Sequence, residues 1–203
     1  MHKFLTLLTC VLAAILISIP FFCSNIQLTN LCQEGQALEL LTVFVFAIAA
    51  LFLCYKKLFD LSIILAIITA RELDLHKFMG DSFLKLKFYT HENDLYKKIL
   101  GVALILAITY IVIKTIIKYT PQVIKDFFRL IPYSLALCFS VGIMVVAKSL
   151  DTAPRFFRKR LDITFDDLTL DYMRYTEESL ELFCSILIVI SIAYFMIGRK
   201  QKA

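Results

Sequence analysis

Long runs of apolar residues constrain this 203-residue chain more than any other feature of its sequence. A helix that crosses the roughly 30 Å hydrocarbon layer of a bilayer needs about 20 mostly apolar residues. Five runs meet that length, and a sixth is shorter because Arg71 interrupts it. We therefore expect an all-α polytopic membrane protein with one domain over residues 1–203 and about six transmembrane helices, at 4–22, 38–55, 58–72, 99–117, 130–149 and 180–198.

The composition supports this expectation and excludes several other classes of protein. Hydrophobic residues make up 60% of the chain and charged residues 19%, whereas soluble domains have roughly 45–50% and 25%. A globule of this size cannot bury so much apolar side chain. A disordered chain, a nucleic-acid-binding domain and an ordinary cytosolic enzyme are excluded, and membrane lipid is the expected partner.

The ends of the predicted spans carry three further signals. The first run begins with His2 and Lys3 like a signal peptide, but no small-x-small cleavage site follows it, so we expect a retained helix. Thr120 followed by Pro121 predicts the start of a short amphipathic helix that lies on the membrane interface. Thr164 and Asp167 fit a capping box that opens a helix leading into the last span.

Charge asymmetry between the two faces predicts the orientation. If the helices alternate, the side with both termini has ten Lys or Arg and two acids, and the opposite side has twelve and fifteen. The short turn with Lys56 and Lys57 and the basic C-terminal tail follow the positive-inside rule, although two long loops on the other side are also basic. We expect a bacterial inner-membrane protein with both termini in the cytoplasm.

The six cysteines indicate no metal centre. Four lie within predicted spans, where a thiol behaves as a small apolar group. Cys23 and Cys32 flank the first outer loop, and they either pair in an oxidising periplasm or remain two separate thiols. Because there is no CxxC and no Cys/His ligand spacing, a structural zinc site is not expected.

Ionisable residues recur at the outer ends of four predicted spans. Such groups are costly at that depth unless they are paired, bound to an ion or wetted by a cavity, so a cluster of them predicts a functional site. The predicted ring of polar residues consists of Glu39, Arg71, Glu72, Asp74, His76, Lys148, Asp151, Glu177, Glu178 and Glu181.

Helical spacing suggests chemistry for this ring. Glu72 and His76 are four residues apart and share a helix face, as do Glu177 and Glu181. One histidine with carboxylates from several helices suits Mg, Mn or Zn, and such an ion can activate water or polarise a phosphoryl or acyl group. In this hypothesis the metal ligands are Glu72, His76, Asp151 and Glu178, which with Glu181 are also the catalytic residues. The residues expected to bind the substrate are Arg71, Lys85, Lys148 and Arg155.

Simpler interpretations of the same charges remain open. Charged residues at helix ends commonly serve as solvated caps or structural ion pairs, and a row of them can also form an ion-conduction path. The segment 154–160, PRFFRKR, is an expected anchor for anionic headgroups, with Phe156 and Phe157 inserted into the interface. The spans contain too few glycines for a GxxxG helix contact.

Four segments carry a resemblance to known proteins. EGQALELLTVFVFAIAALF, ARELDLHKFMGDSFLKLKFY, VVAKSLD and EESLEL together resemble a group of small uncharacterised bacterial inner-membrane proteins. The resemblance covers most of the chain from Glu34 to Leu182 and implies that the ring positions belong to one pattern. The chain is more loosely similar to intramembrane hydrolases of the ceramidase and adiponectin-receptor type, although their HxxxH pair is absent.

Two classes of function follow from these observations. The first is a metal-assisted hydrolase or transferase that acts on a lipid headgroup at an acidic site near the outer interface. The second is a non-catalytic membrane protein, either an accessory subunit of an envelope complex or a small carrier. An envelope protein or a second copy of the chain is the expected protein partner.

Overall fold

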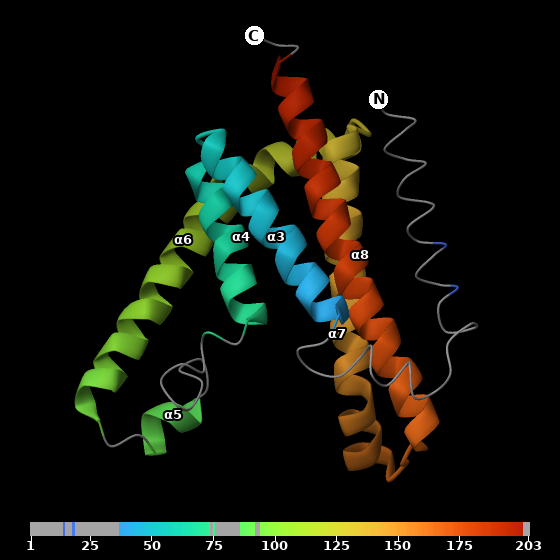
Figure 1. The fold of residues 1–203 in the computed structure, drawn as a ribbon. Helices are drawn as coiled ribbons and strands as arrows, with labels where there is room; N and C mark the ends of the chain where they lie inside the picture. The colour runs from blue at the N-terminus through green and yellow to red at the C-terminus, as the bar shows by residue number, and fades with distance from the viewer. Residues whose placement is uncertain are drawn as a thin grey trace. The chain divides into compact units, whose positions relative to one another are not determined.

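The chain is all-helical wherever its structure is described. The computed structural model describes residues 37–73, 75, 86–91 and 94–200, together with Ala14 and Ser18. These residues contain no strand, which confirms the predicted fold class. The helices are α3 (Ala37–Tyr55), α4 (Phe59–Glu72), α5 (Leu86–His91), α6 (Leu95–Phe128), α7 (Pro132–Leu161) and α8 (Asp167–Lys200) (Figure 1).

Four of the described helices, α3, α6, α7 and α8, are long and apolar enough to cross a membrane, which indicates a multi-pass membrane protein. Helix α4 has 14 residues. At 1.5 Å per residue a helix of that length is about 21 Å long, shorter than the roughly 30 Å hydrocarbon layer. The first predicted span, 4–22, lies outside the described residues. The structure therefore supports four of the six predicted spans.

The helix boundary predicted at Thr120 and Pro121 is wrong. Helix α6 continues through Pro121, so the segment that follows is not a separate interfacial helix. Proline has no amide hydrogen and leaves the carbonyl of Ile117 without its helical hydrogen bond. The long regular helix that precedes it holds the backbone in the helical conformation all the same. Helix α7 likewise continues past its predicted end at 149 and contains Pro154.

The N-terminal cap of α8 also differs from the prediction. The helix begins at Asp167, and the amide of Leu170 donates a 3.1 Å hydrogen bond to the carbonyl of Asp166. The hydroxyl of Thr169 donates to the carboxylate of Asp166, and this bond holds the pKa of Asp166 below its usual range. Asp166, rather than Thr164, is therefore the capping residue. The helix then runs without a break into the last span, as the sequence predicts.

The chain divides into two compact units, residues 46–125 and residues 1–45 with 126–203. The expectation of one domain over the whole chain stays a prediction. In the first unit, α4 contacts α3 and α6 through polar side chains. The hydroxyl of Ser62 donates to the carbonyl of Ala50 at 2.8 Å, and Lys118 forms an ion pair with Asp60.

In the second unit, α7 and α8 lie side by side along most of their length (Figure 1). Small side chains are fully buried on both helices: Ser140 and Ala147 on α7, and Cys184 and Ser185 on α8. The thiol of Cys184 donates to the carbonyl of Ser140 at 3.3 Å. Because small residues let two membrane helices approach closely, this pair packs tightly without a GxxxG motif.

Polar contacts fix the connection between α6 and α7 in the same unit. Asp126, near the end of α6, is buried and accepts a hydrogen bond from the hydroxyl of Tyr133. The hydroxyl of Ser191 on α8 donates to the carbonyl of Tyr133 at 2.7 Å, and the Tyr133 ring meets Phe195 edge-on with ring centroids 5.3 Å apart. These contacts hold the start of α7 against α8.

We predict that enlarging the α7–α8 contact destabilises the protein. Ala147→Leu inserts three carbon atoms at a position that is 0% exposed, and such overpacking costs about 1–3 kcal/mol. Val141→Leu, at a position 59% exposed on the same helix, is the matched control and should leave stability unchanged. The free energy of unfolding in mixed detergent micelles measures both. Equal stability of the two variants would contradict the tight packing of α7 on α8.

Candidate functional site

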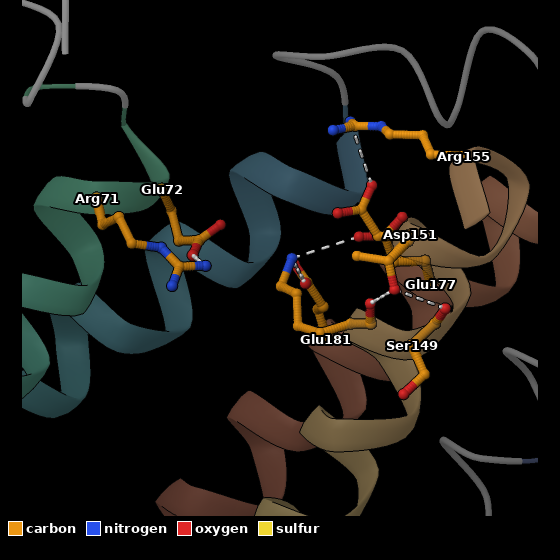
Figure 2. A network of polar contacts seen from close by, with 9 residues as sticks. Arg71, Glu72, Ser149, Asp151, Arg155, Glu177 and Glu181 are labelled. Carbon is orange, nitrogen blue, oxygen red and sulfur yellow. Dashed lines mark hydrogen bonds and ion pairs between the residues drawn. The ribbon is translucent and has the colours of Figure 1, made fainter. Parts of the chain in front are cut away.

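Three charged side chains, Lys148, Glu177 and Glu181, meet between α7 and α8 and are called the Lys148 cluster below. The ammonium nitrogen of Lys148 lies 3.3 Å from Oε1 of Glu177 and also forms an ion pair with Glu181 (Figure 2). Local sequence explains the convergence. Lys148 follows the buried Ala147, and Glu177 and Glu181 are four residues apart on one face of α8.

Burial differs sharply within the Lys148 cluster. The side chains of Glu177 and Glu181 are 13% and 9% exposed, whereas that of Lys148 is 42% exposed. Removing carboxylates from water is costly unless a cation and hydrogen bonds compensate. One ammonium is shared by two carboxylates here, so the cluster carries an excess of negative charge.

Glu178 lies close to the same charges. It is half-buried, and the charges of Glu177, Glu181 and Glu39 all act on it. Glu39 lies in the first turn of α3, next to Leu38, which packs in a small apolar core that also includes residues of α8. Three predicted ring positions on α8 and one on α3 thus belong to a single acidic region.

Asp151 makes a different contact. Its carboxylate lies 3.9 Å from a guanidinium nitrogen of Arg155, one turn along α7 (Figure 2). The Arg155 side chain is 72% exposed, so this pair is weak. Asp151 also interacts electrostatically with Glu177, which places it at the edge of the acidic region.

The remaining predicted site residues lie in the other unit or outside the described residues. Arg71 and Glu72, in the unit of residues 46–125, form an ion pair with each other at 3.0 Å. His76 and Lys85 lie outside the described residues, as does Asp74. Across the part of the chain that the structure describes, no three His, Cys, Asp or Glu side chains are placed to hold a metal ion. The predicted metal site therefore stays a prediction.

Two acids without a predicted role are also partnered. Asp60 is paired with Lys118, and Asp126 accepts the hydrogen bond from Tyr133. These are the two acids that the predicted topology puts on the cytoplasmic side, together with ten basic residues. Two acids among so many basic residues could have indicated that each has a specific partner.

An apolar groove of about 470 Å³ lies on the same unit. It is lined by residues of α7 and by single residues of its neighbours: Phe127, Cys138, Phe139, Gly142, Ile143, Val146 and Leu180. Leu180 is three residues from Glu177 and shares a face of α8 with it. One end of the groove is therefore one helical turn from the Lys148 cluster.

No protein-family model, curated protein or solved structure matches the chain. The resemblance to small bacterial inner-membrane proteins, and the looser similarity to ceramidase-type hydrolases, therefore stay predictions.

We predict that removing the shared ammonium destabilises the protein and that removing a carboxylate as well restores part of the loss. Lys148→Met leaves two buried carboxylates facing each other and should cost about 1–3 kcal/mol, less than the ~3–5 kcal/mol of a fully buried pair because Lys148 is 42% exposed. Adding Glu181→Gln should recover part of this loss.

The control for this experiment is Lys97→Met. Lys97 forms a 3.5 Å pair with Asp94, whose side chain is 63% exposed, and such surface pairs contribute at most about 1 kcal/mol. Unfolding free energies of the wild type, Lys148→Met, Glu181→Gln, the double variant and Lys97→Met, all in one detergent, test the coupling. Additive effects of Lys148→Met and Glu181→Gln would show that the two side chains do not interact.

Proposed function

We propose that the protein is a non-catalytic lipid-binding protein or small carrier, and that its Lys148 cluster binds the headgroup of a zwitterionic phospholipid that bears an amine. One observation carries the proposal: a single, partly exposed ammonium on α7 is shared by two carboxylates on α8 that are 13% and 9% exposed, and both helices are apolar enough to cross a membrane. Ionisable groups in such helices commonly mark substrate or ion pathways.

The charge of the cluster selects the ligand. Glu177 and Glu181 outnumber the one lysine, so a ligand that supplies a cation is favoured over one that supplies only an anion. An ammonium headgroup is such a cation and donates charge-assisted hydrogen bonds to carboxylates. Lys148 then becomes available for the phosphate of the same headgroup.

Exchange of partners leaves the net charge of the cluster unchanged. In this proposal the headgroup ammonium takes the place of Lys148 at Glu177, and Lys148 moves to the headgroup phosphate. A zwitterion brings no net charge into a region of low dielectric constant, so the penalty for burying an unpaired ion is avoided. Lys148 is the partner that moves because its side chain is the most exposed of the three.

The apolar groove supports a ligand with a hydrocarbon tail. Its volume of 470 Å³ falls within the roughly 300–1,000 Å³ of sites that hold drug-sized ligands. It ends one turn from Glu177, so one molecule can place a chain in the groove and a headgroup at the cluster. Phosphatidylethanolamine has the required amine, phosphate and acyl chain.

The topology belongs to the same proposal. Six spans place both termini in the cytoplasm and the cluster at the periplasmic boundary of a bacterial inner membrane. The short α4 then requires Arg71, whose side chain is 54% exposed, to extend its guanidinium to the interface. The Lys148 cluster consists of one ammonium and two carboxylates, which match the charges of a zwitterionic headgroup, so we propose lipid binding rather than lipid cleavage.

We expect the double variant Glu177→Gln/Glu181→Gln to lose selectivity for phosphatidylethanolamine. Each carboxylate hydrogen bond to an ammonium contributes about 1.5–3 kcal/mol, which corresponds to a loss of affinity of about ten-fold or more. Native mass spectrometry with equimolar phosphatidylethanolamine and phosphatidylglycerol reports the bound ratio directly. Asp94→Asn, at an exposed acid just before the start of α6, is the control and should retain the wild-type ratio. An unchanged ratio in the folded double variant would rule out the cluster as the headgroup site.

We expect Gly142→Leu to reduce lipid binding without unfolding the protein. A Cβ atom at Gly142 meets nothing within 4 Å, so a larger side chain enters the groove without a clash. Retention of phosphatidylethanolamine through detergent exchange should fall several-fold, with helix content by circular dichroism unchanged. Val141→Leu places the same side chain on the neighbouring exposed position and should retain lipid as the wild type does. Equal retention by both variants would remove the groove from the proposal.

A further inference from the structure

A second cavity, of about 190 Å³, lies where the connection between α7 and α8 folds back on both helices. Arg155 and Arg158 of α7 and Thr164 of the connection supply its polar groups, and Ile163 and Leu170 supply apolar wall. It shares no lining residue with the apolar groove or with the Lys148 cluster. The proposed function does not depend on it.

The connection has a defined backbone structure. Asp162 ends α7 in the left-handed conformation with φ of 54°, and its amide donates to the carbonyl of Phe157. The amide of Ile163 donates to the same carbonyl at 3.3 Å. The Phe157 and Phe165 rings pack edge-on with centroids 5.6 Å apart. These contacts hold the connection against the last turns of α7, and thereby form the cavity.

The two arginines at this cavity have few ion-pair partners among the described residues. There Arg155 has only the long 3.9 Å contact with Asp151, and Arg158 has none. Asp166, the acid that caps α8, accepts a hydrogen bond from Thr169 and forms no ion pair with either arginine in the described part of the chain. Two guanidinium groups and a hydroxyl at one cavity are suited to a phosphate group, because each planar guanidinium can donate two parallel hydrogen bonds to its oxygens.

If Lys148 lies at the boundary of the hydrocarbon layer, as in the proposed function, the cavity lies at a suitable depth for a lipid phosphate. Arg155 is seven residues beyond Lys148 on α7, which is about 10 Å along a helix axis. The polar headgroup layer adds roughly 5–8 Å on each side of the hydrocarbon, and arginine side chains extend over several ångströms. Phe156, between the two cavity arginines and 57% exposed, is suited to the membrane interface.

We propose that this cavity is a binding site for the phosphate group of an anionic phospholipid, held by Arg155 and Arg158. The sequence predicts only a diffuse basic anchor over 154–160. The structure divides that anchor into two arginines that line a cavity and two further basic residues, Lys159 and Arg160, that do not. Because each pair of residues carries two positive charges, replacing either pair changes the net charge by the same amount, and the two variants can be compared directly.

The experiment compares two double variants of the full chain that each remove two positive charges. Binding of dioctanoyl phosphatidic acid is measured from the rise in the thermal unfolding midpoint with lipid concentration, since a ligand that binds the folded state stabilises it. Arg155→Gln/Arg158→Gln should weaken binding at least ten-fold, because charge-assisted hydrogen bonds are lost. Lys159→Gln/Arg160→Gln should change it less than about three-fold, as expected for exposed charges that only attract the ligand from a distance. Equal losses in the two variants would mean diffuse attraction and would overturn the proposal.

Two further arms complete the test. Inorganic phosphate at the same concentrations should produce a smaller shift, because it lacks the apolar chain that holds the headgroup at the interface. An equal shift would assign the cavity to free phosphate and overturn the lipid assignment. If the arginine double variant does not fold, Arg158→Lys preserves the charge but not the planar pair of donors. Its affinity should fall several-fold, and unchanged affinity would overturn the role of Arg158.

Discussion

The close packing of α7 against α8 is the interaction on which the polar cluster, the groove and the cavity all depend. Ser140 and Ala147 on one helix and Cys184 and Ser185 on the other are small and fully buried, and the Cys184 thiol lies 3.3 Å from the Ser140 carbonyl oxygen. Apolar surface provides little drive for helix association within lipid, so contacts of this kind provide it instead. Once the helices are this close, Lys148 faces the two glutamates of α8. The opposite charges then reduce the free-energy cost of removing one another from water.

The arrangement of the cluster has a functional consequence beyond stability. A buried carboxylate pair with one flexible lysine can exist in more than one set of ion pairs, since Lys148 is far more exposed than either glutamate. A zwitterionic headgroup offers both charges needed to replace the internal pair. The net charge of the site is then the same whether the site is empty or occupied.

Sequence patterns predicted the elements better than they predicted the contacts between them. Apolar runs placed α3 within one residue of its start, and the spacing of Glu177 and Glu181 correctly indicated a shared face. The boundary at Pro121 was wrong because a proline within a long helix removes one hydrogen bond but does not end the helix. Periodicity gives the face of a helix but not the rotation of its neighbour, so the sequence could not show that Lys148 binds carboxylates. The contact through serine, alanine and cysteine was also not predicted, because the GxxxG motif concerns glycine alone.

The most direct test of the account is the distance between the Lys148 nitrogen and lipid phosphorus in a bilayer. Solid-state NMR can measure ¹⁵N–³¹P dipolar coupling for ¹⁵N-lysine protein in membranes of phosphatidylethanolamine, with Lys148→Met to assign the signal. The account predicts a short contact, within about one ion-pair distance, between Lys148 and a lipid phosphate, and its absence in the variant. A wild-type spectrum in which no ³¹P coupling depends on Lys148 would contradict exchange of ion-pair partners at the cluster.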